Sequence, residues 1–318
     1  MASCKRPPER FALNPTFGSE MRMNELHGFL IVDKPSGVTS FSIVSLVRRL
    51  TDVRRVGHAG TLDPLASGVL PVAIGHATRL IEYLDDELKT YVAAVRFGTA
   101  TDTYDAEGAV TATVDAAHID GASIEAALRA FVGSIEQRPP IYSALKVAGK
   151  PLYRYAREGA DVAVATRRVY VERATLHAYA DGVAEIEIRC GKGTYIRSLA
   201  HDLGAAVGCV AHLAALRRTS TGGFAIDQAQ TPQTIEAAAR DHNLADLVLA
   251  PDRAVERRPA AIFDEARTLD VTSGRDVTIE TETSAPYCRA YSVSGDFLGV
   301  LENRPAGVWH PAKIVPTR

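Results

Sequence analysis

The amino-acid sequence predicts an α+β fold with a mixed, largely antiparallel sheet, followed by a small β-rich C-terminal segment. Two observations carry this prediction: hairpin patterns are mixed with helical patterns without strict alternation, and the composition changes past Ala250. The chain has 318 residues, 46% hydrophobic and 23% charged, close to an average globular protein. This length suits one large domain with a smaller one.

The N-terminal residues, 1–26, are polar and lack periodicity, so we expect a flexible extension there. A short apolar run, residues 28–33, predicts a buried strand. Thr39 or Ser40 is the expected cap of a helix whose apolar face reaches Leu50.

The middle of the chain alternates between strand and helix patterns. Residues 91–97 predict a strand, and apolar residues from Ile124 to Phe131 have the spacing of an amphipathic helix. Residues 169–190 alternate between apolar and polar across Asp181-Gly182, which predicts an antiparallel hairpin, with a helix past Ile196.

The C-terminal part is predicted to be a separate small domain over residues 252–318, preceded by a larger domain over residues 27–250. Pro251 and the charged residues up to Arg258 are interpreted as the linker. The predicted strands beyond the linker are 288–293, 297–301 and a last run near Ile314.

Charge and cysteine content exclude several classes of protein. The formal net charge is −2, but residues 138–170 hold seven basic and two acidic side chains, so this basic segment could grip phosphates. The four cysteines are far apart and form no CxxC pair, which favours a reduced cytoplasm and argues against a zinc site. No apolar run is long enough for a membrane helix, and the N-terminus lacks an apolar signal core.

The densest motif is a loop rich in glycine and proline over residues 55–68, in which Asp63 is the only carboxylate. Asp63-Pro64 alone predicts a helix start, with Asp as the N-cap and Pro in the first turn. A constrained loop of this kind also commonly carries function, and an aspartate at a turn can face a cleft.

This loop, Gly57-His-Ala-Gly-Thr-Leu-Asp-Pro-Leu-Ala-Ser-Gly68, resembles the signature of TruB-type tRNA pseudouridine synthases. Further motifs resemble the same family in the same order, over roughly residues 27–220. They are Val32-Asp-Lys-Pro-Ser-Gly-Val-Thr-Ser40, Lys89-Thr-Tyr91, Gln137-Arg-Pro-Pro-Ile-Tyr-Ser-Ala-Leu-Lys146, Gly193-Thr-Tyr-Ile-Arg-Ser198 and Leu216-Arg-Arg218. The C-terminal segment resembles the family's small PUA-like domain more weakly.

The resemblance implies a catalytic domain of the pseudouridine synthase type and a definite reaction. The family breaks the N1–C1′ bond of a uridine in RNA, turns the uracil and rejoins the sugar through C5. In the bacterial branch the target is uridine 55 in the T-loop of tRNA. The reaction is an isomerisation, so we expect no cofactor and no metal, and the sequence shows no motif for either.

The resemblance also implies the site residues. Asp63 matches the catalytic aspartate, and Arg197 matches the cationic partner that favours its anion. Tyr91 matches the aromatic residue that stacks on the uracil, and its hydroxyl is a candidate for moving the C5 proton. Tyr195 and Leu216 match a second pocket tyrosine and an apolar pocket wall. Asp63 could attack C1′, attack the base or remove the 2′ proton, and these alternatives stay open.

Three further residues are expected to bind the substrate. His58 matches a histidine that contacts the RNA and helps to hold the everted nucleotide. Lys146 and Arg154 lie in the basic segment, part of which corresponds to a family insertion that clamps RNA. The expected partner is the T-arm of tRNA, and we expect a cytoplasmic monomer without a membrane or an obligatory protein partner.

Three other functions compete with this prediction. A non-catalytic RNA-binding or RNA-chaperone protein on the same scaffold would be expected to lose Asp63, Tyr91 or Arg197, which this chain retains. A hydrolase could pair Asp63 with another carboxylate, but Asp102 and Asp105 lie in an acidic, turn-like segment without an acid/base pattern. A guide-RNA-dependent synthase is disfavoured by the small C-terminal segment and the lack of long basic tails.

Overall fold

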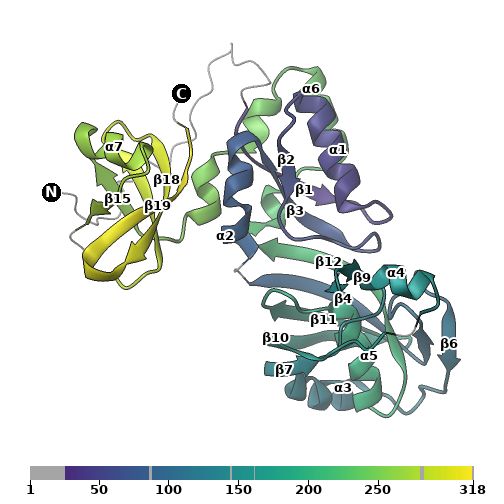
Figure 1. Ribbon diagram of the computed structural model, residues 1–318. Helices are drawn as coiled ribbons and strands as arrows, with labels where there is room; N and C mark the ends of the chain where they lie inside the picture. Colours follow the sequence, from purple (N-terminus) through teal and green to yellow (C-terminus); the bar gives the residue numbers. More distant parts are fainter. Residues whose placement is uncertain (1–25, 86–87, 144, 161, 280–282, 317–318) are drawn as a thin grey trace.

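The computed structural model describes residues 26–85, 88–143, 145–160, 162–279 and 283–316. The predicted N-terminal extension lies outside these ranges except for Leu26, which is buried. The described residues form a ten-stranded sheet, a five-stranded sheet and two short two-stranded sheets. Figure 1 shows the five-stranded sheet (yellow and green, left) beside the larger one. No helix in the described ranges is long and apolar enough to cross a membrane.

The large sheet confirms the predicted α+β class. Its strands are β1 Gly28–Lys34, β2 Val56–His58, β3 Ser67–Ile74, β4 Lys89–Phe97, β7 Gly133–Gln137, β10 Arg167–Ala180, β11 Val183–Cys190, β12 Ala211–Thr221, β13 Phe224–Ala225 and β14 Val248–Leu249. The main order is β14-β1-β3-β12-β4-β11-β10-β7, with β2 paired to β3 and β13 to β12. Its pairs are antiparallel except β12 with β3, so the sheet is mixed.

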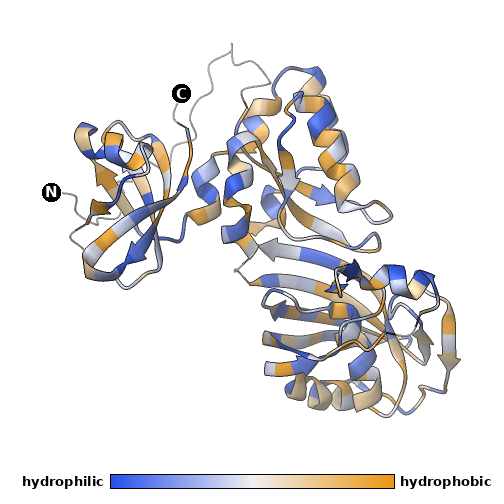
Figure 2. Cartoon of the chain, in the orientation of Figure 1, coloured by the Kyte–Doolittle hydropathy of each residue, from blue (hydrophilic) through white to orange (hydrophobic). Residues whose placement is uncertain are grey.

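Four helices bury apolar side chains against the large sheet, and the last helix packs on the five-stranded sheet. The helices are α1 Ser40–Thr51, α2 Ile81–Asp85, α3 Gly121–Leu128, α4 Leu152–Arg157, α5 Ile196–Ala206, α6 Pro232–Arg240 and α7 Glu265–Thr272. Thr39 caps α1 as predicted, because its Oγ1 accepts from the Ser42 backbone N–H at 3.0 Å. Figure 2 shows orange and blue residues on α1, the mixture expected of a helix with one buried face.

The predicted hairpin consists of β10 and β11. Asp181 and Gly182 join the strands with positive φ values of 51° and 72°, the pattern of a tight turn that matches strand twist. Along β11, Ala184, Ile186 and Ile188 are buried on the core face, next to β4. Because β11 pairs with β4, the segment that leads from Cys190 to α5 starts near the centre of the sheet.

The predicted linker is wrong in part. Residues Pro251–Val255 form a 3-10 helix, and Ala254 and Val255 are buried in an apolar cluster with Phe29 of β1. The charged residues of this stretch are typical of a linker, but the two apolar residues between them pack against the sheet.

The C-terminal sheet confirms the three predicted strands. Its strands are β15 Ala260–Phe263, β16 Val277–Thr278, β17 Tyr287–Ser292, β18 Phe297–Arg304 and β19 Val308–Ile314, in the order β15-β17-β18-β19-β16. β15, β16 and α7 were not predicted. Val300 of β18 joins the apolar cluster of Phe29, so the two sheets share buried surface. The division at residues 250–252 stays a prediction.

Candidate active site

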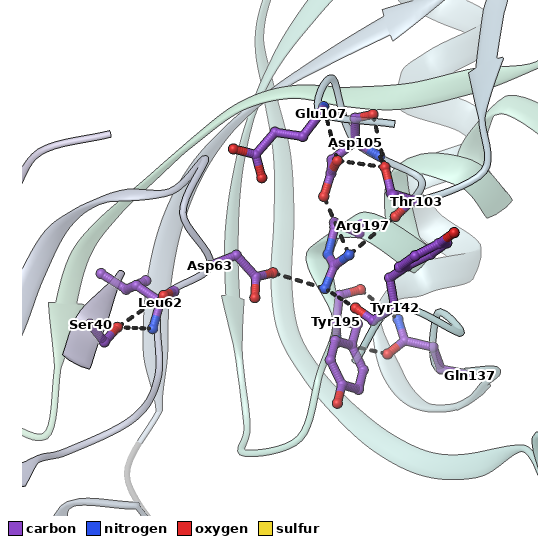
Figure 3. A network of polar contacts seen from close by, with 10 residues as sticks. All are labelled: Ser40, Leu62, Asp63, Thr103, Asp105, Glu107, Gln137, Tyr142, Tyr195 and Arg197. Carbon is purple, nitrogen blue, oxygen red and sulfur yellow. Dashed lines mark hydrogen bonds and ion pairs between the residues drawn. The ribbon is translucent and has the colours of Figure 1, made fainter. Parts of the chain in front are cut away.

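The loop that carries Asp63 is held from behind by the segment after β1. Lys34 is fully buried, and its Nζ donates to the carbonyls of Val38 at 2.7 Å and Pro64 at 3.4 Å. Burial lowers the pKa of Lys34 to about 8. The hydroxyl of Ser40 bonds both the N–H and the C=O of Leu62, each at 2.9 Å (Figure 3). These bonds fix the backbone on both sides of Asp63.

The helix start predicted at Asp63-Pro64 is wrong. No helix begins there; the Ala66 N–H donates to the Asp63 carbonyl at 3.1 Å in a turn, and β3 follows at Ser67. The Pro64 carbonyl already accepts from the Gly37 N–H at 2.8 Å and from Lys34. Contacts from about thirty residues earlier in the chain therefore override the local helix signal.

Arg197 meets Asp63 at the first turn of α5. Its Nη2 lies 3.0 Å from Oδ2 of Asp63, and its Nη1 lies 3.3 Å from Oδ2 of Asp105. The guanidinium also donates to the backbone carbonyls of Thr103 at 3.2 Å and Tyr142 at 3.0 Å. Figure 3 shows Arg197 between the two carboxylates. The Arg197 side chain is 7% exposed and that of Asp63 is 43% exposed, so the buried cation presents the aspartate to solvent.

Asp105 is a site residue that the sequence did not reveal. Its side chain is 4% exposed, and its Oδ1 accepts from the Thr103 hydroxyl at 2.6 Å and the Glu107 N–H at 3.1 Å. Burial raises the pKa of the nearby Glu107, and the charges of Asp105 and Asp63 raise it further. The sequence showed only an acidic, turn-like segment and, far along the chain, the motif that contains Arg197. Neither feature indicates that Asp105 and Arg197 are in contact.

Tyr195 forms the N-cap position of α5 and is fixed by Gln137. The Tyr195 N–H donates to Gln137 Oε1 at 2.8 Å, and Gln137 Nε2 donates back to the Tyr195 carbonyl at 3.0 Å. The guanidinium of Arg167 lies over the Tyr195 ring, 4.6 Å from its centroid. Because Gln137 is buried, this pair fixes the start of the helix that carries Arg197.

Tyr91 and Leu216 come from the neighbouring strands β4 and β12. Tyr91 lies opposite Arg218 and Leu216 lies opposite Ala93 in the register of these strands. Tyr91 is 8% exposed, and burial raises the pKa of its hydroxyl, while the charge of Arg218 opposes this rise. The strand pair therefore supplies the wall of the site opposite the loop.

A cavity of about 290 Å³ brings these residues together. Asp63, Tyr91, Tyr195, Arg197 and Leu216 all line it, although they come from positions far apart in the chain. The other lining residues are Gly60, Thr61, Leu62, Ala66, Lys89, Ser143, Arg167, Gly191, Gly193, Thr194, Ile196 and Arg218. A cavity with an ion pair at its wall and an aromatic side chain beside it suits a small planar group next to a reactive carboxylate.

The other three predicted residues do not line this cavity. His58 ends β2, while Lys146 begins the short strand β8 (Lys146–Val147) and Arg154 lies in α4. Lys146 and Arg154 are exposed. Among the described residues, no group of three or more His, Cys, Asp or Glu side chains could hold a metal ion.

Two family models match the chain. Residues 48–196 match the N-terminal domain of TruB family pseudouridylate synthase, and residues 197–256 match the C-terminal domain of tRNA pseudouridylate synthase B. A relative named tRNA pseudouridine synthase B from Dehalococcoides mccartyi is 40% identical over 289 residues, which cover 91% of this chain and 96% of the relative. A relative of the same name from Thiobacillus denitrificans is 41% identical over 290 residues, with the same coverage of both chains.

Solved structures match the fold. A chain in the crystal structure of a Cbf5-Nop10-Gar1 complex superposes with a TM-score of 0.70 at 25% identity, covering 92% of this chain and 85% of that chain. A chain in a structure of an H/ACA RNP bound to a substrate RNA containing 2′-deoxyuridine has a TM-score of 0.69 at 22% identity, with coverage of 95% and 90%.

Proposed function

The chain belongs to the TruB family of pseudouridylate synthases, and from this premise we propose that it acts on uridine 55 in the T-loop of tRNA. It is an isomerase that converts a uridine of tRNA to pseudouridine. We propose further that Asp63 is the catalytic carboxylate and that neither a metal ion nor a guide RNA takes part. The identity of about 40% to relatives named tRNA pseudouridine synthase B supports a stand-alone enzyme.

One observation carries the catalytic assignment. Asp63 is the carboxylate that pairs with a buried arginine at 3.0 Å while keeping 43% of its side chain exposed beside the cavity. Asp105 pairs with the same arginine but is buried, so it cannot reach a substrate as Asp63 can. Glycosyl chemistry needs a carboxylate beside C1′, and Asp63 is available for that position.

The surrounding residues have separate roles in this proposal. Arg197 holds the Asp63 carboxylate in one orientation through a charge-assisted hydrogen bond. Tyr91 stacks on the uracil, Leu216 forms the apolar wall, and Tyr195 fixes the start of the helix that carries Arg197. Asp63 then attacks C1′, attacks the base or removes the 2′ proton; each role needs a carboxylate close to the everted nucleotide.

The uridine must leave its stack to reach Asp63. Unstacking costs on the order of a few kcal/mol, which stacking on Tyr91 and contacts to the RNA backbone offset. The exposed basic side chains Lys146 and Arg154 are proposed to contact phosphates, and His58 is proposed to contact the everted nucleotide. We also propose that residues 252–318 form a small RNA-binding domain.

The test incubates an unmodified tRNA transcript with the wild-type protein or with Asp63→Asn. The buffer contains EDTA, and no guide RNA is added. Pseudouridine is mapped along the transcript. We expect wild type to modify position 55, and a folded Asp63→Asn variant that still binds tRNA to be inactive. Equal conversion by the variant contradicts the assignment of Asp63.

Two other outcomes favour the competing functions. Tight binding of tRNA without conversion by wild type favours a non-catalytic RNA-binding protein. Conversion only after addition of a guide RNA favours a guide-dependent synthase. A transcript with cytidine at position 55 is the substrate control, and modification elsewhere in this transcript contradicts the proposed specificity.

A further inference from the structure

Arg218 is a second buried arginine at the cavity, in surroundings unlike those of Arg197. It is fully buried on β12 and lines the same cavity. Its Nε donates to the Val69 carbonyl at 2.7 Å, and its Nη2 donates to the Gly60 carbonyl at 3.0 Å. Arg218 lies directly opposite Tyr91 in the register of β12 and β4, and both residues line the cavity.

No carboxylate pairs with Arg218 among the residues that the structure describes, whereas Arg197 pairs with Asp63 and Asp105. Removing a guanidinium from water without an anion is costly, because carbonyl dipoles replace only part of the hydration. A group that bears negative charge during the reaction would complete the surroundings of Arg218. The Tyr91 oxygen is the neighbouring group that can develop such a charge.

Tyr91 needs this help if its oxygen is to accept a proton. Burial alone disfavours a negative phenol oxygen, and the positive charge of Arg218, on the neighbouring strand, acts in the opposite direction. A preorganised cation beside an atom that develops charge is the usual way in which a buried site stabilises a proton transfer.

We propose that Arg218 is a positioning residue that stabilises the Tyr91 side chain as a phenolate, and that this phenolate oxygen takes the C5 proton of the rotated uracil. The inference rests on the proposed function. After C5 has bonded to C1′, the C5–H bond breaks and its electron pair forms the C5–C6 double bond. The C6–N1 π pair moves to N1, which accepts a proton from water, and Tyr91 later returns its proton to the resulting hydroxide.

A purely structural role for Arg218 makes a different prediction. Gly60 and Val69 lie on opposite sides of Asp63 in the chain, so Arg218 also fastens both ends of the Asp63 loop. Loss of this fastening would misplace Asp63 and slow the early step at the sugar or base. Loss of charge beside Tyr91 would slow the late removal of the C5 proton. A hydrogen isotope effect at C5 distinguishes these steps.

The experiment measures single-turnover conversion of tRNA transcripts made with C5-protiated or C5-deuterated uridine. Wild type, Arg218→Gln and Arg218→Lys are compared as full-length proteins, with melting curves and tRNA dissociation constants for each. We expect Arg218→Gln to slow conversion by about 10²-fold with unchanged tRNA affinity and with an isotope effect larger than that of wild type. Arg218→Lys keeps a cation, so we expect an intermediate rate of conversion and a smaller increase in the isotope effect.

The neighbouring Arg217 supplies a matched control. Its guanidinium pairs with both oxygens of Asp33, at 2.8 and 3.1 Å, and it does not line the cavity. Arg217→Gln is expected to lower the melting temperature without changing the isotope effect.

Three results overturn the inference while leaving the proposed function intact. The first is a slow Arg218 variant with the wild-type isotope effect, and the second is a wild-type rate of conversion in Arg218→Gln. The third is weaker tRNA binding that accounts for the whole loss of conversion rate. If Arg218→Gln does not fold, Arg218→Lys alone decides by the same criteria. Absence of conversion by wild type instead contradicts the proposed function.

Discussion

The cavity and the basic segment of residues 138–170 hold their functional side chains in opposite ways. At the cavity, buried bonds fix each group: Ser40 holds the loop of Asp63, and Asp105 holds Arg197. In the basic segment, Lys146 and Arg154 are exposed on short elements. The difference teaches that the groups proposed to act on the sugar and base are preorganised by the fold, whereas the groups proposed to contact the charged RNA backbone need only lie near its path.

The largest effect that sharpens this comparison is expected at Asp105. Asp105→Asn keeps the shape but removes the buried anion beside Arg197, so the arginine is held less firmly against Asp63. Conversion in single-turnover kinetics should fall by about 10²-fold, and urea unfolding should show a loss of about 3 kcal/mol.

Asp102→Asn is the control for this change. Asp102 lies in the same acidic turn, but its Oδ1 accepts from the Ala109 N–H at 2.8 Å and does not contact Arg197. Its substitution should leave the rate within about threefold. An equal loss of conversion rate in both variants would mean that the rate depends on the acidic turn and not on the ion pair between Asp105 and Arg197.

The next effect concerns pH and the buried Lys34. Burial lowers its pKa from 10.5 to about 8, so between these values the unfolded chain binds a proton that the native protein has released. The contribution of Lys34 to the free energy of unfolding therefore rises as the pH increases from about 8 to 10.5, by up to about 1.4 kcal/mol per pH unit.

Urea unfolding at pH 7, 8 and 9 tests this, with Lys34→Met as the comparison. The variant should be less stable throughout, because it loses the bonds to the carbonyls of Val38 and Pro64, and its stability should rise less with pH than that of wild type. Parallel pH profiles in the two proteins would count against a perturbed lysine.

A smaller effect is expected from Ser40→Ala. The substitution leaves the buried N–H and C=O of Leu62 without their partner, at a cost of about 1–3 kcal/mol in urea unfolding. Ser36→Ala, which removes an exposed bond of 2.8 Å to the Leu65 carbonyl, should cost about 1 kcal/mol or less. If the exposed serine matters as much as the buried one, burial does not explain how the loop is fixed.

The smallest effect on catalysis is expected in the basic segment. Lys146→Gln combined with Arg154→Gln should weaken tRNA binding and lower the slope of log affinity against log salt by about 1–2, with the rate at saturating tRNA unchanged. Fluorescence anisotropy at several salt concentrations measures the slope. Arg173→Gln removes an exposed arginine of β10 outside the segment, and an equal change in that control removes the argument for the segment.

Local patterns predicted much of the fold, because the physics that they report acts over a few residues. The Thr39 cap and the Asp181-Gly182 turn are decided by neighbouring backbone groups, and both predictions are confirmed. The helix expected at Asp63-Pro64 failed because the Pro64 carbonyl is claimed by Lys34 and Gly37, which are distant in sequence. The charged neighbours of Val255 likewise predicted an exposed linker, although Val255 is buried.

Motif resemblance predicted which residues belong to the site, but it could not predict their geometry. Five of the eight predicted residues line one cavity. Asp105 and Arg218 were given no role, because the tertiary fold brings the turn of Asp105 to the helix of Arg197, and strand register places Arg218 opposite Tyr91. The functional roles of these residues stay predictions until the variants are measured.

The position of β1 has a consequence for synthesis of the protein. Phe29 and Leu30 pair with Leu249 and Val248, which leave the ribosome only after most of the chain has been translated. Until then the nascent chain keeps one edge of its apolar first strand open to other edges and to chaperones. Completion of the sheet is therefore a late event of translation, and a ribosome that stalls before Val248 releases a polypeptide with an unprotected edge.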